Sequence, residues 1–576
     1  MIVFEQRFPK GLDLRRTAPA GAARGGGPSD AAAGGEAVGG TVFPRIDVNA
    51  SYANSLPCFS YHGVFAVFSE CSSLSAYVPS EQGGVPLVMY SPDEPDLPML
   101  VLSPLNEPMA TSISRDAGLT GLPQLGLGLL PGIEVVPKDW SQLFLLSAGS
   151  GVNEGMMAWG DRMLRYHGQQ RVDNRYRDDV HGGIGFWTDN GGYYHYSVGH
   201  NASLGATYEE VLPKVKAYHD AIGVPFRHWQ FDSWFYPKDG PVGQGGGGGA
   251  VTNWTALASV FPGGMARIQA QLRVPLVMHN RQWSPTSDYI HNWTDIDWHV
   301  SKTTALPKDP LRFFERFFGE QQGWGLAMYE QDWMTKQYQE TDALKSNVSL
   351  GGLWLRGMAA GAASANRTVQ YCMPLPTQVL AAAELPAVTN VRASGDYVDR
   401  GQWDIGNNAL LLWALNKLPF KDGFYTSTQP QIGGETVGPE RNPDREAIMA
   451  TLSCAMVAPM DGIYLLNASR VMATCRKDGV VLKPDRPATT VDACYRRREP
   501  GCRVYSTHSA VSGLGAIRYY FANGSARALL ADEVGVAPEA ASDFAVLNWY
   551  TRTARRLEAT NWLGAGYEGH VYAVVA

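Results

Sequence analysis

Between about residue 180 and residue 475, short apolar runs alternate with helix-like stretches, and this alternation restricts the fold more than any other feature of the chain. Helical patterns such as Leu350–Ala363 and Arg445–Met456 separate runs that have the length and residue types of buried strands. The eight runs are Ile184–Thr188, His228–Phe231, Val274–Met278, Leu326–Tyr329, Val369–Cys372, Asn390–Ala393, Gly423–Thr426 and Gly462–Leu466. Eight strands that alternate with helices predict a (β/α)8 TIM barrel over residues 180–475.

The segments on either side of this region have a different pattern. Residues 1–150 are rich in Pro and Gly and contain short β-type runs, which predicts an N-terminal β-sandwich. Within it, the low-complexity stretch 17–40 is predicted to be a disordered insertion. Residues 151–179 are predicted to begin with a linking helix, and residues 476–576, where short strands return, to form a C-terminal β-domain. We therefore expect a multidomain α/β protein.

Composition limits the partners of the protein. The net charge is -7 and the pI is about 6.0, which argues against a nucleic-acid or anionic-membrane surface. No run of about 18 apolar residues occurs, so no membrane span is expected. The sequence leaves the oligomeric state open.

Signals for the cellular compartment point in different directions. The N-terminus lacks the basic and apolar regions of a signal peptide, yet eight Asn-x-Ser/Thr sequons favour a secretory or extracellular route. A cytoplasmic or plastid location is the alternative. Seven cysteines without a CxxC spacing argue against a zinc site, while Cys475, Cys494 and Cys502 lie close enough in sequence for one local disulfide.

Carboxylates follow two of the predicted strands. Asp332 comes just after Leu326–Tyr329, and Asp396 comes just after Asn390–Ala393. The loops after the strands form the active face of a parallel barrel. Two carboxylates on such strand ends are what glycoside cleavage requires, although each can also be an ordinary helix N-cap.

Other strand ends carry tryptophans beside polar groups. Trp187 and Asp189 close the first strand, Asp232 and Trp234 the second, and His279 the third. A capped strand end, or a histidine satisfied in the core, is the alternative for any single position. Their repetition on one face of one barrel favours a cleft that binds sugar hydroxyls.

At these residues the chain resembles the raffinose synthase and alkaline α-galactosidase family, within the α-galactosidase clan of glycoside hydrolases. The resemblance covers about residues 180–525 and rests on motifs in the family's order. They are Phe186–Asn190, His228–Trp234, Glu330–Asp332, Gln370–Met373, Arg392–Tyr397 and Leu482–Asp485.

The resemblance implies a retaining enzyme that acts on α-galactosides without a metal or cofactor. Asp332 falls on the family's nucleophile, and Asp396 on its acid/base. Substrate contacts are then expected from Asp189, Asp232, Arg392 and His279, with Trp187, Trp234 and Trp333 as walls. A galactosyl transferase of the raffinose synthase type and a non-catalytic sugar-binding protein on the same barrel are the alternatives.

The chain departs from the family at three positions. Glu330 replaces the lysine before the nucleophile, Phe231 replaces the first aspartate of an Asp-Asp pair, and Gly395 replaces the aspartate before the acid/base. The loss of the lysine and of one aspartate removes expected contacts to galactose hydroxyls, and such contacts determine specificity. The sequence therefore predicts the reaction class more firmly than the sugar.

Overall fold

The structure is a computed structural model. It describes residues 1–14, 41–80, 82–116, 124–193, 203–240, 249–397, 405–431, 439–498, 502, 504–513, 515–522, 528–530, 536, 538–549, 551–557, 560–562 and 570–575. The insertion predicted at residues 17–40 lies outside the described residues.

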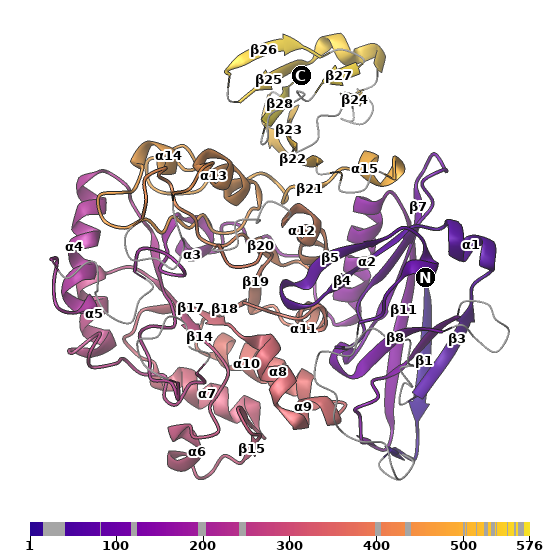
Figure 1. Cartoon of the computed structure of the whole chain (residues 1–576), viewed down its shortest axis with the longest axis horizontal. Coiled ribbons are helices and arrows are strands. Elements are labelled where there is room, and N and C mark those ends of the chain that lie inside the picture. Colours follow the sequence, from indigo (N-terminus) through magenta and orange to yellow (C-terminus); the bar gives the residue numbers. More distant parts are fainter. Residues whose placement is uncertain are drawn as a thin grey trace.

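In the described part of the chain, a parallel sheet of seven strands forms the central region (Figure 1). The strands neighbour one another in chain order, as expected when each strand is followed by a crossover helix. They are β12 (Gly185–Phe186), β13 (His228–Phe231), β14 (Leu276–Asn280), β17 (Leu326–Gln331), β18 (Thr368–Tyr371), β19 (Val388–Arg392) and β20 (Leu418–Phe420).

A short irregular stretch, residues 457–460, links the two outer strands of this sheet. Val457 forms a parallel bridge with Ile184, and Pro459 forms one with Phe424. The amide of Gly185 donates to the Val457 carbonyl at 3.0 Å. Residues 457–460 thus connect Ile184, directly before β12, with Phe424, four residues after β20, without forming a regular strand.

The last two predicted strands were misplaced. The structure has β20 at Leu418–Phe420 instead of Gly423–Thr426, and the bridging stretch at 457–460 instead of Gly462–Leu466. Both observed segments contain a proline, which is usually excluded from central strands because it cannot donate a ladder hydrogen bond. Their sequences therefore looked like turns.

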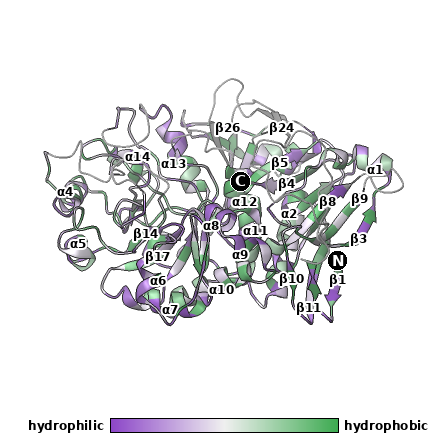
Figure 2. Cartoon of the chain, turned by 60° about the horizontal axis from the view of Figure 1, so that its bottom comes forward, coloured by the Kyte–Doolittle hydropathy of each residue, from purple (hydrophilic) through white to green (hydrophobic). Residues whose placement is uncertain are grey.

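Helices α4 (Tyr208–Ala221), α5 (Gly264–Leu272), α7 (Pro310–Glu320) and α10 (Leu350–Ser364) are among those that follow the strands. Helix α7 carries hydrophilic and hydrophobic residues (Figure 2), and its phenylalanines are buried. Helix α10 approaches it closely, because a Cβ on Gly357 would lie 2.6 Å from the Pro310 backbone. Any larger residue there would force the two helices apart.

The N-terminal region contains two antiparallel sheets that share a core. In the described residues, one has the order β1 (Ile2–Phe8), β11 (Trp140–Ser150), β7 (Pro98–Pro104), β6 (Leu87–Tyr90), β4 (Cys58–His62) and β5 (Val67–Cys71). The other has the order β3 (Thr41–Asp47), β9 (Gln124–Leu129) and β8 (Thr111–Asp116). Met89 and Phe144 of the first pack in one cluster with Ile113 and Leu127 of the second.

Helix α2 (Val152–Tyr166) leads from these sheets to the central region and buries Met156, Trp159 and Met163 on one face. At the other end of the chain, strands gather in the yellow part of Figure 1. They include β22 (Val504–Val511), β23 (Gly515–Ala522), β25 (Ala545–Asn548), β26 (Thr553–Arg556) and β28 (His570–Val575), which pair antiparallel.

Among the described residues, cysteines form two disulfides. Cys494–Cys502 is the local bond that the cysteine cluster allowed. Cys58–Cys71 was not predicted; it joins directly paired residues of β4 and β5, so only the strand register reveals it. No helix in the described ranges combines the length and apolar character that a bilayer crossing requires.

Candidate active site

Asp332 follows β17, and its buried side chain is held by His279 at the end of β14 and by the backbone amide of Trp333. His279 Nε2, at the end of β14, donates to Asp332 Oδ2 at 3.0 Å, and the hydroxyl of Tyr236 lies 2.7 Å from His279 Nδ1. The amide of Trp333 donates to Asp332 Oδ1 at 2.6 Å. Burial raises the pKa of Asp332, but the hydrogen bond and charge of His279, together with Cys372 and Arg281, outweigh it, so the pKa lies below its ordinary value. Asp332 is therefore held as an oriented anion.

Asp396, four residues after Arg392 of β19, has the opposite electrostatic setting. Its side chain is 31% exposed, and Arg392 Nη2 donates to its Oδ1 at 2.9 Å. Burial raises the pKa of Asp396 to about 7; Arg392 opposes this shift, whereas the charges of Asp422 and Asp332 add to it. Asp332 and Asp396 thus act on each other electrostatically, and both follow carboxyl ends of the parallel strands.

Arg392 is fully buried and binds carboxylates from three strand ends. Its Nη1 lies 3.1 Å from Asp189 Oδ2, and its Nη2 lies 2.9 Å from both Asp396 Oδ1 and Asp422 Oδ2. Burial, followed by the charges of Asp422 and Asp232, raises the pKa of Asp189 well above its ordinary value. The Arg392 guanidinium therefore connects Asp189, a predicted substrate-binding group, with Asp396, the predicted acid/base.

Sequence reasoning missed two neighbours of Arg392. Asp422 follows β20, but the misplaced seventh strand put it before a strand instead of after one. Phe65, from the turn between β4 and β5, has its ring centroid 5.3 Å from the guanidinium carbon. No local pattern indicates Phe65, because it comes from the N-terminal region and only the tertiary fold brings it here.

Asp232 and Glu330 are linked by one amide. Gln230 Nε2 donates to Asp232 Oδ2 at 3.0 Å and to Glu330 Oε2 at 2.9 Å. Burial, together with the charges of Asp232 and Asp332, raises the pKa of Glu330 well above its ordinary value. Glu330, on β17 two residues before Asp332, therefore lies on the same face of the sheet as Asp332, and its carboxyl group is harder to ionise than that of an ordinary glutamate.

Trp187 and Trp234 are not walls of the site, contrary to the prediction. Both are completely buried: Trp187 packs on Phe420 with ring centroids 4.5 Å apart, and Trp234 packs on Tyr208 at 4.7 Å. Their faces are already covered by aromatic rings, so neither can contact a sugar. Trp333 is partly exposed, with the Arg281 guanidinium carbon 4.8 Å from its ring centroid. It remains a candidate wall.

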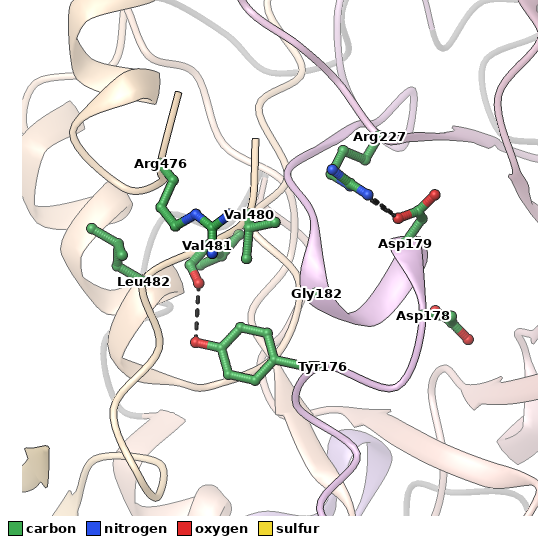
Figure 3. A pocket seen from close by; sticks show the side chains of 9 residues that line it. All are labelled: Tyr176, Asp178, Asp179, Gly182, Arg227, Arg476, Val480, Val481 and Leu482. Carbon is green, nitrogen blue, oxygen red and sulfur yellow. Dashed lines mark hydrogen bonds and ion pairs between the residues drawn. The ribbon is translucent and has the colours of Figure 1, made fainter. Parts of the chain in front are cut away.

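A separate cavity of about 590 Å³ lies at the opposite end of the strands (Figure 3). Its lining includes Gly182, which precedes β12, and Arg227, which precedes β13. Arg227 pairs with Asp179, and the Tyr176 hydroxyl donates to the Val481 carbonyl at 3.1 Å. None of the candidate site residues lines this cavity, and active sites of parallel barrels lie at the carboxyl ends of the strands. The carboxylate cluster is therefore the candidate active site.

No family model and no curated protein sequence matches the chain. Solved structures do. The GH36 α-galactosidase AgaA from Geobacillus stearothermophilus, in complex with raffinose, superimposes with a TM-score of 0.58 at 11% identity, over 92% of this chain and 76% of that one. The fold is similar to that of a GH36 α-galactosidase.

A β-arabinopyranosidase is also similar, with a TM-score of 0.50 at 10% identity over 92% of this chain and 79% of that one. The fold expected from the alternating strands and helices, a multidomain chain around a parallel sheet of barrel type, thus agrees with the solved structures.

Proposed function

We propose that the protein is a retaining α-glycosidase that acts on α-galactosides, with Asp332 as nucleophile and Asp396 as acid/base. The observation that carries this proposal is the difference between the pKa values of two interacting carboxyl groups. The pKa of Asp332 is lowered, and that of Asp396 is raised to about 7. Environments that push two carboxyl pKa values apart assign the base-like and acid-like roles. At neutral pH the first group can attack while a substantial fraction of the second still holds a proton.

In the proposed first step, Asp332 attacks the anomeric carbon while Asp396 gives its proton to the departing oxygen. A glycosyl-enzyme forms, and this bond removes the negative charge of Asp332. Because that charge helps to raise the pKa of Asp396, its loss lowers the pKa of Asp396. Asp396 is then suited to take a proton from the incoming water. This mechanism requires the two carboxyl groups to be about 5–5.5 Å apart.

The proposed hydroxyl-binding groups are Asp189 and Asp232. His279 orients Asp332, and the buried Arg392 orients the carboxylates of Asp189 and Asp396. The galactoside preference is supported by the GH36 α-galactosidase whose structure contains raffinose. Phe231 packs against Trp234 and Phe261 and is completely buried, so it contributes no polar group. Glu330 places a carboxyl group of raised pKa where the family that the sequence resembles has a lysine. These two differences are the reason to test several sugars.

The proposal includes the division of the chain. Residues 1–150 form a β-sandwich, residues 151–179 link it to the barrel, residues 180–475 form the catalytic (β/α)8 barrel, and residues 476–576 form a β-domain. The shared core of the N-terminal sheets and the bridges made by residues 457–460 support this division.

A screen of aryl α-glycosides, with and without sucrose or galactinol as acceptor, tests the function. We expect the α-galactoside to release its phenol fastest, with water as the main acceptor. Transfer products in preference to hydrolysis would favour the raffinose synthase alternative. Sugar binding without turnover of any glycoside would contradict the enzyme and favour the sugar-binding alternative.

Replacing Asp232 by alanine is expected to weaken sugar binding by about 10- to 100-fold and to slow turnover, because a charge-assisted hydrogen bond is lost. KM, kcat and calorimetric binding of galactose measure this effect. Asp220→Ala, which removes an exposed carboxylate paired with Lys216, is the control. Unchanged binding, or loss of the folded state by circular dichroism, would show that Asp232 is structural.

The pH dependence of kcat/KM should be bell-shaped. Asp396 must hold a proton, so activity is expected to fall as the pH rises through about 7. Asp332 must be ionised, so activity should persist until the pH falls below about 3.8, the ordinary value of an aspartate. The profile is measured on an alkyl α-glycoside, which needs acid assistance. Activity that increases through pH 7 would contradict the role of Asp396.

A further inference from the structure

We propose that Asp422 is a positioning residue for Asp396, acting through Arg392 and through the backbone of Tyr397. The inference rests on the proposed function, since it concerns how the acid/base is held. Asp422 is completely buried, so it cannot contact a sugar itself. Any effect of Asp422 on the reaction must therefore pass through its neighbours.

Two contacts connect Asp422 to Asp396. Arg392 Nη2 lies 2.9 Å from Asp422 Oδ2 and 2.9 Å from Asp396 Oδ1, so one nitrogen serves both carboxylates. The amide of Tyr397, the residue directly after Asp396, donates to Asp422 Oδ2 at 2.7 Å. Asp422 thus holds in place the guanidinium of Arg392, which binds Asp396, and the backbone next to Asp396.

The local chain explains why Asp422 can hold this position. Its other oxygen accepts from the amide of Gly423 at 2.8 Å, and its own amide donates to Ser394 Oγ at 3.3 Å. Ser394 lies between Arg392 and Asp396, so the loops after β19 and β20 are tied together at several points. The carboxylate is therefore set in place before any ligand binds.

Removal of the Asp422 charge should lower the pKa of Asp396. Arg392, Asp422 and Asp332 act on the pKa of Asp396, and the charge of Asp396 in turn raises the pKa values of Asp189 and Cys372; these groups come from five strand ends. The Asp422 charge helps to raise the pKa of Asp396, and Asp422 also shares the guanidinium that lowers it. Removing the Asp422 charge withdraws the first effect and leaves Arg392 free to act more strongly on Asp396. Both changes lower the pKa of Asp396.

The test is the pH profile of kcat/KM for Asp422→Asn, which keeps the shape and removes the charge. The basic limb is expected to move to lower pH by at least about one unit. Asp461→Asn is the matched control, because Asp461 is an equally buried aspartate that accepts from the Thr426 amide. Its basic limb should stay at the wild-type position. A limb that stays in place for Asp422→Asn, or moves equally for Asp461→Asn, would overturn the proposal.

Asp422→Glu retains the negative charge, so the basic limb of its kcat/KM pH profile should lie at the wild-type position. If Asp422→Asn does not fold, a clear shift of the basic limb of the pH profile in Asp422→Glu would overturn the proposal.

Failure of the proposed function is recognised separately, because the wild type would then turn over no glycoside. In that case 13C NMR of carboxyl-labelled aspartate still reports the titration of Asp396, assigned by its loss in Asp396→Asn. A midpoint that is the same in wild type and Asp422→Asn would contradict the positioning role.

Discussion

Asp332→Asn is expected to reduce turnover of every α-glycoside by at least about 10⁴-fold, the order of effect seen when a catalytic nucleophile is removed. Asparagine keeps the shape and can still accept from the Trp333 amide, so the fold should survive. The loss should not depend on the leaving group, because no glycosyl-enzyme can form. Initial rates with nitrophenyl and alkyl α-glycosides measure the effect.

Added azide distinguishes a role of Asp332 as nucleophile from a purely structural role. Added to Asp332→Asn, azide should replace the missing nucleophile from the opposite face of the sugar and give the β-glycosyl azide. Asp342→Asn, at an exposed carboxylate paired with Lys345, is the control and should be as active as the wild type. Formation of the α-glycosyl azide in Asp332→Asn would mean that the two catalytic roles are reversed.

Asp396→Asn should have a selective effect. Substrates with poor leaving groups should react about 10²- to 10⁴-fold more slowly, because they need a proton to depart. A nitrophenyl glycoside needs little protonation, so its glycosyl-enzyme should still form and then hydrolyse slowly. A burst of nitrophenol in pre-steady-state kinetics, followed by a slow steady rate, measures this behaviour.

Azide should accelerate the second step in Asp396→Asn and give the α-glycosyl azide, because azide needs no general base. Asp444→Asn, which removes an exposed carboxylate paired with Arg470, is a surface control that should show neither the burst nor the acceleration. Equal slowing of all substrates in Asp396→Asn, without rescue, would place the acid/base elsewhere.

The sequence determined the features that depend on local pattern. Alternating strands and helices predicted the parallel sheet, and positions just after Leu326–Tyr329 and Asn390–Ala393 marked Asp332 and Asp396 as neighbours. The prediction for the two aspartates rests on the rule that the carboxyl ends of parallel strands share one edge of the sheet, so residues just after different strands are expected to lie on the same side. Arg392 was predicted for the same reason, as it ends β19 four residues before Asp396.

Only the tertiary structure decided the features that depend on which way a side chain points and on contacts between distant segments. Trp187 and Trp234 stand at strand ends like Asp332, but surrounding rings cover them. Asp422 follows a short strand containing a proline, and Phe65 arrives from another sheet, so neither had a local signal. The pKa of Asp396 results from burial and from charges on other strands, a sum that no stretch of sequence contains.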